Sequence, residues 1–278
     1  MQPTHAILNA GNGAWAFEVL ASQLACTLWV EVTDQPADFV YVLGWDDDEP
    51  PNCETFIPFE SVRIASDKRL QADLFAKCGL AVPRTYLLES PGEVERFLKA
   101  ERDCEWVLKY PTGCGAAGHR VMRTGEPLPE GWPRPYVVQE FIRLKHPEVY
   151  RLYGIAGETF GWNVRRFPTG TKPSPWVAHA RGARYARPGK APEEAEELVC
   201  RALTACELFG SFGCVDLLCT DAGRWLVLEV GTNGVFNHVD RALELSDVEQ
   251  ELNQRLAEAF WADSPIRPWG SGGWEPKR

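Results

Sequence analysis

Two apolar segments in the C-terminal part of the chain carry acidic residues whose spacing indicates a cation site. Residues 213–219 and 225–230 both have strand-like composition, and a glycine-containing turn separates them, so we expect an antiparallel hairpin. A symmetric fold about that turn places Asp216 directly opposite Glu229 on one face. Like charges so placed destabilise a hairpin unless a cation lies between them, and two carboxylates suit Mg²⁺. A register shifted by one residue, or one protonated carboxyl, is the alternative.

Two lysines lie where they could bind the phosphates of a ligand. Lys109 ends an apolar segment and is followed by the glycine-rich residues 111–118, whose amides could face phosphate oxygens. The glycine spacing matches neither the P-loop nor the dinucleotide fingerprint. Lys68 follows Asp67 at an expected helix start, where the helix dipole disfavours a cation and a ligand would favour one. An ordinary turn and a surface lysine are the alternatives.

The order of these motifs is more specific than any one of them. In chain order the motifs are Ser66-Asp67-Lys68, Gly79-Leu80-Ala81-Val82-Pro83, Val107-Leu108-Lys109 with its glycine loop, Val138-Gln139-Glu140-Phe141-Ile142, Asp216 and Glu229. Over residues 1–245 this order resembles the ATP-grasp superfamily. Within it, the chain looks most similar to carboxylate–amine ligases such as ribosomal-protein glutamate ligases and D-alanine–D-alanine ligases.

The resemblance implies ATP and Mg²⁺ as cofactors, with Asp216 and Glu229 as metal ligands. The two lysines would contact the phosphates and the glycine loop would close over them. Residues 139–142 would form a hinge whose backbone and Glu140 carboxylate contact the adenine edge, and Glu148 would hold the ribose. The full set implied for the nucleotide is Lys68, Lys109, Thr112, Gly113, Gly115, Gly118, Gln139, Glu140, Phe141, Ile142, Glu148 and Arg151.

The chain departs from the pattern of its relatives at two places. Relatives have asparagine two residues after the second carboxylate, where this chain has Gly231. Asn233 could supply the missing amide oxygen, or it could be an ordinary Asn-Gly turn residue. Relatives also have an arginine that faces the acyl phosphate. Arg181 and Arg184 are both candidates for that catalytic position, and the sequence does not choose between them.

The expected substrate contacts follow the hairpin, where Asn237, His238 and Arg241 lie. An arginine there suits a carboxylate-bearing amino acid or peptide. Helix capping or surface pairing is the competing explanation for all three residues.

The implied reaction is ATP-dependent amide bond formation through an acyl phosphate, on an amino acid, peptide or small natural-product precursor. A kinase of the same fold, which stops after phosphoryl transfer, is one alternative. A non-catalytic nucleotide-binding module is another, because Gly231 replaces a residue that relatives use.

Composition narrows the function classes. The net charge of −10 argues against non-specific nucleic-acid binding. Nine cysteines form no zinc-type spacing and are expected to be reduced thiols. The sequence has neither a membrane-spanning apolar run nor a signal-peptide pattern, so we expect a cytoplasmic protein with no membrane partner. A homodimer stays open.

The elements that must position these residues indicate a mixed α/β (α+β) protein. An N-terminal α/β domain with a small parallel sheet is expected over residues 1–65. Two α+β lobes that enclose ATP are expected over 66–142, which includes the hinge, and 143–262, which includes the metal hairpin. An irregular tail would occupy 263–278. The second domain is expected to begin with a helix capped by Ser66.

Overall fold

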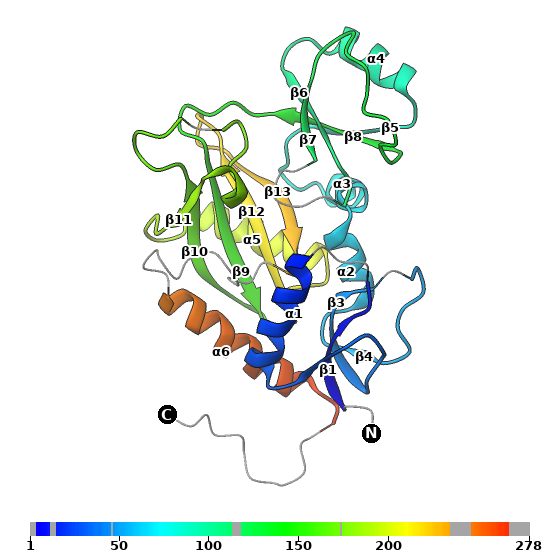
Figure 1. The fold of residues 1–278 in the computed structure, drawn as a ribbon. Helices are drawn as coiled ribbons and strands as arrows, with labels where there is room; N and C mark the ends of the chain where they lie inside the picture. The colour runs from blue at the N-terminus through cyan, green and yellow to red at the C-terminus, as the bar shows by residue number, and fades with distance from the viewer. Residues whose placement is uncertain are drawn as a thin grey trace. The chain divides into compact units, whose positions relative to one another are not determined.

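A computed structural model describes residues 4–11, 15–45, 47–112, 118–172, 174–233 and 246–266. The chain forms two compact units: unit 1 comprises residues 1–56 and 257–278, and unit 2 comprises residues 57–256. Both contain helices and sheets, which confirms the mixed α/β class (Figure 1). The four-part domain division expected from the sequence has different bounds and stays a prediction.

Unit 1 is built on a parallel sheet with strand order β2-β1-β3-β4. Strands β1 and β3 are almost entirely buried, which fits a parallel sheet whose central strands are covered on both faces. The end of α6 adds Phe260, whose ring lies 5.0 Å from that of Phe39 and 5.6 Å from that of Phe56. The elements are β1 (His5–Asn9), α1 (Trp15–Leu28), β2 (Glu31–Thr33), β3 (Phe39–Gly44), β4 (Glu54–Thr55) and α6 (Ser246–Asp263), of which α6 begins in unit 2.

Unit 2 begins with two helices and an antiparallel sheet of order β5-β8-β6-β7, here called the small sheet. Helix α4 covers it, and Val94 and Leu98 of that helix pack on Trp106, Leu108 and Val138. The elements are α2 (Phe59–Ser66), α3 (Lys68–Lys77), β5 (Thr85–Leu88), α4 (Pro91–Ala100), β6 (Glu105–Lys109), β7 (His119–Met122) and β8 (Tyr136–Phe141).

The helix expected to start at Ser66 is a correction. Ser66 ends α2, and its hydroxyl donates to the carbonyl of Val62 at 2.7 Å. Asp67 breaks the two helices with an extended backbone and caps α3, because its carboxylate accepts from the amide of Arg69 at 2.8 Å. Asp67 also places Lys68 at the first position of α3.

The second sheet of unit 2, here called the large sheet, has order β11-β10-β9-β12-β13 and is antiparallel (Figure 1). Helix α5 packs closely on it. A Cβ added at Gly154 or Gly213 would lie 2.4 or 2.7 Å from the Leu203 side chain, so both positions need glycine. The elements are β9 (Glu148–Ile155), β10 (Glu158–Arg166), the short 3₁₀ helix His179–Arg181, β11 (Arg184–Ala186), α5 (Glu193–Ala205), β12 (Phe212–Cys219) and β13 (Trp225–Gly231).

Helix α3 is fastened to the β12–β13 hairpin by a side chain that bonds to the backbone of β13. The buried side-chain amide of Gln71 donates to the carbonyl of Val230 at 3.0 Å and accepts from the backbone amide of Val230 at 3.0 Å. The Val227 amide donates to the carbonyl of Ala81 at 2.8 Å. These bonds fix the start of α3 beside β13. In the part of the chain that the structure describes, no helix has the length and apolarity needed to cross a membrane.

Candidate functional site

The hairpin has the register expected from the sequence. Asp216 of β12 pairs with Glu229 of β13, and a bulge follows at Leu217. On its other side β12 pairs with β9, so Asp216 also lies opposite Arg151. Directly opposed residues share a face of a sheet. Arg151, Asp216 and Glu229 therefore form one row across three strands.

Asp216 is buried and held by two arginines. Arg151 donates to its carboxylate from Nε at 2.7 Å and from Nη2 at 3.1 Å, and Arg165 of β10 donates to the same carboxylate from Nη2. Burial alone would raise the pKa of Asp216, but the two guanidinium groups outweigh it and lower the pKa to about 2. The carboxylate is therefore ionised at neutral pH.

Arg165 was not among the residues expected from the sequence. Its guanidinium lies over the ring of Tyr185, with 5.6 Å from Cζ to the ring centroid. Its buried Nε has no hydrogen-bond partner among the described residues. One signal could have found it: Arg165 and Arg166 are adjacent at the end of an apolar strand, and strand alternation directs one of them inward.

Lys68 and Lys109 lie at the other end of this row. Lys68 Nζ is 3.7 Å from Glu229 Oε2, and the side chain of Glu229 is 43% exposed. Lys109 is buried, and its pKa falls to about 8, chiefly because burial disfavours the charged ammonium. The charge of Glu229 opposes this effect, and the charge of Lys68 adds a smaller one in the same direction as burial. We name six residues the ribbon cluster, whose four cations and two carboxylates give a net charge of +2: Lys68, Lys109, Arg151, Arg165, Asp216 and Glu229.

A cavity of about 210 Å³ lies between the small and large sheets and adjoins the cluster at Lys109. Its walls are mainly apolar, as expected for a site that holds a flat organic group. Its lining residues are Val107, Lys109, His119, Gln139, Phe141, Ile142, Arg143, Leu144, Pro147, Glu148, Val149, Pro175, Trp176, Val177, Leu218 and Leu228. The structure thus brings together five residues of the expected nucleotide set.

His119 and Trp176 were missed by the sequence interpretation. The Trp176 ring lies 5.2 Å from the ring of His119 and 5.2 Å from that of Phe141, both edge to face. Burial, and then the nearby charge of Lys109, lower the pKa of His119 to about 3, so its imidazole is neutral. The sequence offered no signal for either residue, because strand pairing and a long loop bring them to the cavity.

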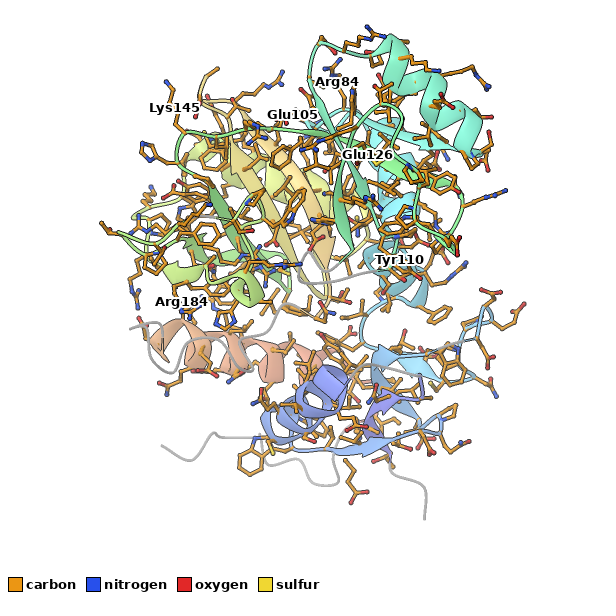
Figure 2. All side chains as sticks on the ribbon, turned by 45° about the horizontal axis from the view of Figure 1, so that its top comes forward. Arg84, Glu105, Tyr110, Glu126, Lys145 and Arg184 are labelled. Carbon is orange, nitrogen blue, oxygen red and sulfur yellow. The ribbon has the colours of Figure 1, made fainter. Side chains whose placement is uncertain are left out.

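The hinge residues divide between two faces of β8. Gln139 lines the cavity, and its amide nitrogen donates to the hydroxyl of Thr85 at 2.9 Å, which leaves its carbonyl oxygen as the acceptor. The neighbouring Glu140 does not line the cavity. Its carboxylate accepts from Nε of Arg84 at 3.1 Å, and Figure 2 shows Arg84 beside the small sheet. The cavity-facing part of the hinge is therefore Gln139 with Phe141 and Ile142.

Glu148 lines the cavity but its carboxylate has protein partners. It accepts from the hydroxyl of Tyr150 at 2.5 Å and pairs with Arg166 at 3.5 Å. Its expected contact with ribose stays a prediction.

The glycine loop is described only at its ends. Thr112 is exposed, and the amide of Tyr110 donates to the carbonyl of Gly118 at 2.7 Å. A Cβ at Gly118 would lie 2.2 Å from Cβ of Tyr110, a residue labelled in Figure 2, so this closure needs glycine. The expected site residues that lie outside the described part of the chain are Gly113, Gly115, Asn237, His238 and Arg241.

The two arginine candidates lie in different places. Arg184 is exposed on β11, the edge of the large sheet away from β13, and it donates to the carbonyl of Ala183 at 3.0 Å (Figure 2). Arg181 is also exposed, but its charge contributes to the lowered pKa of His119. Arg181 is therefore the one whose charge acts on the cavity.

The oxygen donors of the row fit a hard divalent cation better than a transition metal. No group of three or more His, Cys, Asp or Glu side chains that could hold a metal occurs within the described ranges. Asp216 and Glu229 provide two carboxylates on one face. The side-chain oxygen of Asn233 lies 3.6 Å from the point that a Cβ on Gly231 would occupy, which brings an amide oxygen close to the position that relatives fill with asparagine. Two carboxylates and an amide oxygen suit Mg²⁺.

Solved structures with the same fold cover nearly the whole chain. D-alanyl-alanine synthetase A from Vibrio cholerae is 13% identical over 94% of this chain and 98% of its own, with a TM-score of 0.66. D-alanine–D-alanine ligase from Bacillus anthracis, complexed with ATP, is 13% identical over 92% of this chain and 95% of its own, with a TM-score of 0.64. The ATP-grasp ligase PsnB, complexed with minimal precursor, Mg and ADP, is 13% identical over 92% of this chain and 97% of its own, with a TM-score of 0.59.

At such identities these likenesses show a shared fold, and the ligands of the relatives are consistent with the expected ATP and Mg²⁺. A comparison with curated proteins finds no match. The model of the ATP-grasp domain family matches residues 65–232, which is more than half of the sequence. The chain belongs to the ATP-grasp family.

Proposed function

We propose that this protein is an ATP-dependent ligase that joins a carboxylate to an amine, releasing ADP and phosphate. The observation that carries the proposal is the ribbon cluster, with a net charge of +2 beside a largely apolar cavity. Mg-ATP has the complementary form, with an apolar base and a polyphosphate whose net charge with the metal is about −2.

The cavity supports binding of the adenine base. Phe141, Leu218 and Leu228 offer apolar walls, and the side-chain carbonyl oxygen of Gln139 can accept a hydrogen bond from an exocyclic amino group. Lys68 and Lys109 would then contact the phosphates. A phosphate beside Lys109 would restore its full protonation by offsetting the cost of burial.

Asp216 and Glu229 would hold Mg²⁺, with the side-chain oxygen of Asn233 as a third donor. Bound there, Mg²⁺ would neutralise phosphate charge in the transfer step. The pairing of Asp216 with Arg151 and Arg165 keeps that carboxylate ionised and in place before any ligand arrives. The arrangement therefore needs no proton release from Asp216 when the cation binds.

The first chemical step joins a substrate carboxylate oxygen to the γ-phosphorus of ATP and breaks the bond to ADP. In the second step an amine nitrogen attacks the acyl carbon, phosphate leaves with the bonding electrons, and the amine proton passes to solvent. Both steps develop negative charge on oxygen, which cationic side chains stabilise. We assign that role to Arg165, with its unpartnered Nε, and to Arg181.

The proposed substrates are an amino acid, a peptide or a small natural-product precursor. A peptide is within the range of the fold, because the structure of PsnB is described in complex with the precursor peptide PsnA2. The proposal includes a cytoplasmic location and leaves a homodimer open.

The test is a screen for ADP release over amino acids and dipeptides with Mg-ATP, followed by mass analysis of the products. ADP and phosphate released only when both substrates are present, with a product lighter by one water than their sum, is the expected result. ADP release with a stable phosphorylated product would instead identify a kinase. No ADP release from any pair, with Mg-ATP bound, would identify a binding module.

A matched pair of variants localises the activity. Glu229→Gln should lower kcat/KM at least about a hundredfold with folding retained, because a carboxylate ligand is lost from a half-exposed position. Glu126→Gln is the control. Within the described residues, the carboxylate of Glu126 pairs with Arg123 at 3.7 Å, and Figure 2 shows Glu126 on the side of the small sheet. Equal activity of the two variants would remove the metal hairpin from the mechanism.

A further inference from the structure

Unit 1 presents an apolar stripe that the described part of the chain leaves exposed. Trp29 is 78% exposed, Val32 43% and Val19 40%, and all three are large apolar side chains of this unit. Helical spacing places Val19, Ser22 and Cys26 along one side of α1, and Trp29 follows at its end. We name Val19, Cys26 and Trp29 the α1 stripe, and Val32 of β2 follows Trp29 by three residues in the chain.

Trp29 is held in a conformation that its residue type disfavours. Its φ is +60°, in the left-handed region, and it follows the last residue of α1. The amide of Val30 donates to the carbonyl of Ala25 at 3.0 Å, the bond of a helix terminus that usually has glycine at this point. A tryptophan here is both strained and exposed, so the folding of α1 does not explain why the position holds tryptophan. A contact between the Trp29 side chain and another group would explain it.

The C-terminal part of unit 1 contacts the end of α1. The indole of Trp261 in α6 donates to the carbonyl of Leu28, the neighbour of Trp29, at 3.0 Å. Ser264 hydrogen-bonds to His5 at 2.7 Å, and His5 begins β1, the strand that pairs with β2. The twelve residues 267–278 follow directly and can reach up to about 40 Å when extended.

The chemistry of residues 267–278 complements the stripe. They contain Trp269 and Trp274, and three cations against one carboxylate give them a net charge of +2 in a chain of −10. The exposed acids nearest in sequence to the stripe are Glu18, Glu31 and Asp34. We propose that residues 267–278 of this chain dock on the α1 stripe, with a tail tryptophan covering Trp29 and the tail cations facing these acids.

A native thiol in the stripe provides the test. Cys26 and Cys78 are both exposed in the structure, and Cys78 belongs to unit 2. The two thiols would be alkylated with iodoacetamide in the full chain, and the modified peptides quantified by mass spectrometry over time. Docking predicts that the Cys26 to Cys78 rate ratio rises about fivefold in Trp269→Ala/Trp274→Ala and in Trp29→Ala, because intramolecular contact at high effective concentration protects Cys26.

The control is Tyr86→Ala, which removes an exposed aromatic residue of unit 2 and should leave the ratio unchanged. Circular dichroism would verify that each variant is folded. Unchanged ratios in both tryptophan variants would overturn the proposal. A ratio that rises on dilution of the unmodified chain would also overturn it, because the stripe would then be covered by a second copy.

Discussion

Two arginine–carboxylate clusters in unit 2 have opposite composition. At the β12–β13 hairpin one carboxylate, Asp216, is shared by two arginines, and all three side chains are at most 13% exposed. Beside the hinge one arginine, Arg84, is shared by Glu140, Asp103 and Glu101, and it is 40% exposed. The buried cluster has an excess of positive charge, and the outer cluster has an excess of negative charge.

The difference shows where charge is available for a ligand. Water screens the excess charge of the outer cluster, so those ion pairs add little to stability and attract little. The buried cluster has no such screening. Its excess positive charge is costly without an anion, and an arriving polyphosphate would meet that charge in a medium of low dielectric constant. We infer that the hairpin cluster serves ligand binding and the hinge cluster serves local packing.

The largest expected effect comes from Asp216→Asn. This change removes the carboxylate that both Arg151 and Arg165 bind, and removal of one partner of a buried ion pair typically costs about 3–5 kcal/mol in the free energy of unfolding. Urea unfolding followed by circular dichroism measures it. A decrease in the free energy of unfolding no larger than that for a surface ion pair would show that water reaches the cluster in solution. The contrast drawn between the buried and the outer cluster would then be wrong.

Lys109→Met should stabilise the free protein at neutral pH and weaken ATP binding. The folded pKa of Lys109 is about 8, below its ordinary value of 10.5, so the unfolded state binds more protons between these pH values. The stability of the wild type therefore rises as pH increases from about 8 to 10.5, by up to about 3 kcal/mol. Urea midpoints across this range should rise in the wild type and stay flatter in the variant, which titration calorimetry should show to bind ATP at least about tenfold more weakly.

Acid should remove the contribution of Asp216 in a defined range. Its folded pKa of about 2 lies below its ordinary value of 3.8, so its stabilising effect is complete above pH 3.8 and is lost as pH falls toward 2. The loss is about 2 kcal/mol. Comparison of acid unfolding in the wild type and in Asp216→Asn isolates it, since the variant cannot titrate there. Parallel acid-unfolding curves would contradict the assignment.

The smallest effect is expected for Arg84→Ala. Arg84 and two of its three carboxylate partners are exposed and their charges are screened, so the urea midpoint should not change measurably, at low or at high salt. A strong loss of nucleotide affinity in this variant, with stability unchanged, would show that the hinge cluster acts on the cavity after all. That result would sharpen the comparison, because Glu140 would then link Arg84 to the hinge.

The register of the β12–β13 hairpin could be predicted from the sequence because it depends on a local turn. Asp216 and Glu229 are thirteen residues apart, and the turn between them fixes the pairing. Arg165 could not be placed in the same way. Its contact with Asp216 joins residues of β10 and β12, which lie on either side of β9, and only the order of the strands brings them together.

The hinge shows a different limit. Gln139 and Glu140 are adjacent in a strand, so the sequence requires them to face opposite sides. It does not state which side holds the cavity, and that is decided by Arg84, which binds Glu140 on the other face. At α3 the sequence predicted the wrong N-cap for a local reason. Ser66 and Asp67 are both good helix caps, and in the structure Asp67 caps α3 because its carboxylate accepts from the amide of Arg69.

The sequence alone predicted most of the strands, the motif order typical of ATP-grasp proteins and the pairing of the two carboxylates, since these depend on periodicity and on short turns. Only the tertiary structure decided which charges surround that pair and which side chains form the cavity. Those contacts join segments far apart in the chain, such as Lys68 with Glu229, and they depend on how two sheets pack. Such packing is a property of the whole fold, which no local pattern encodes.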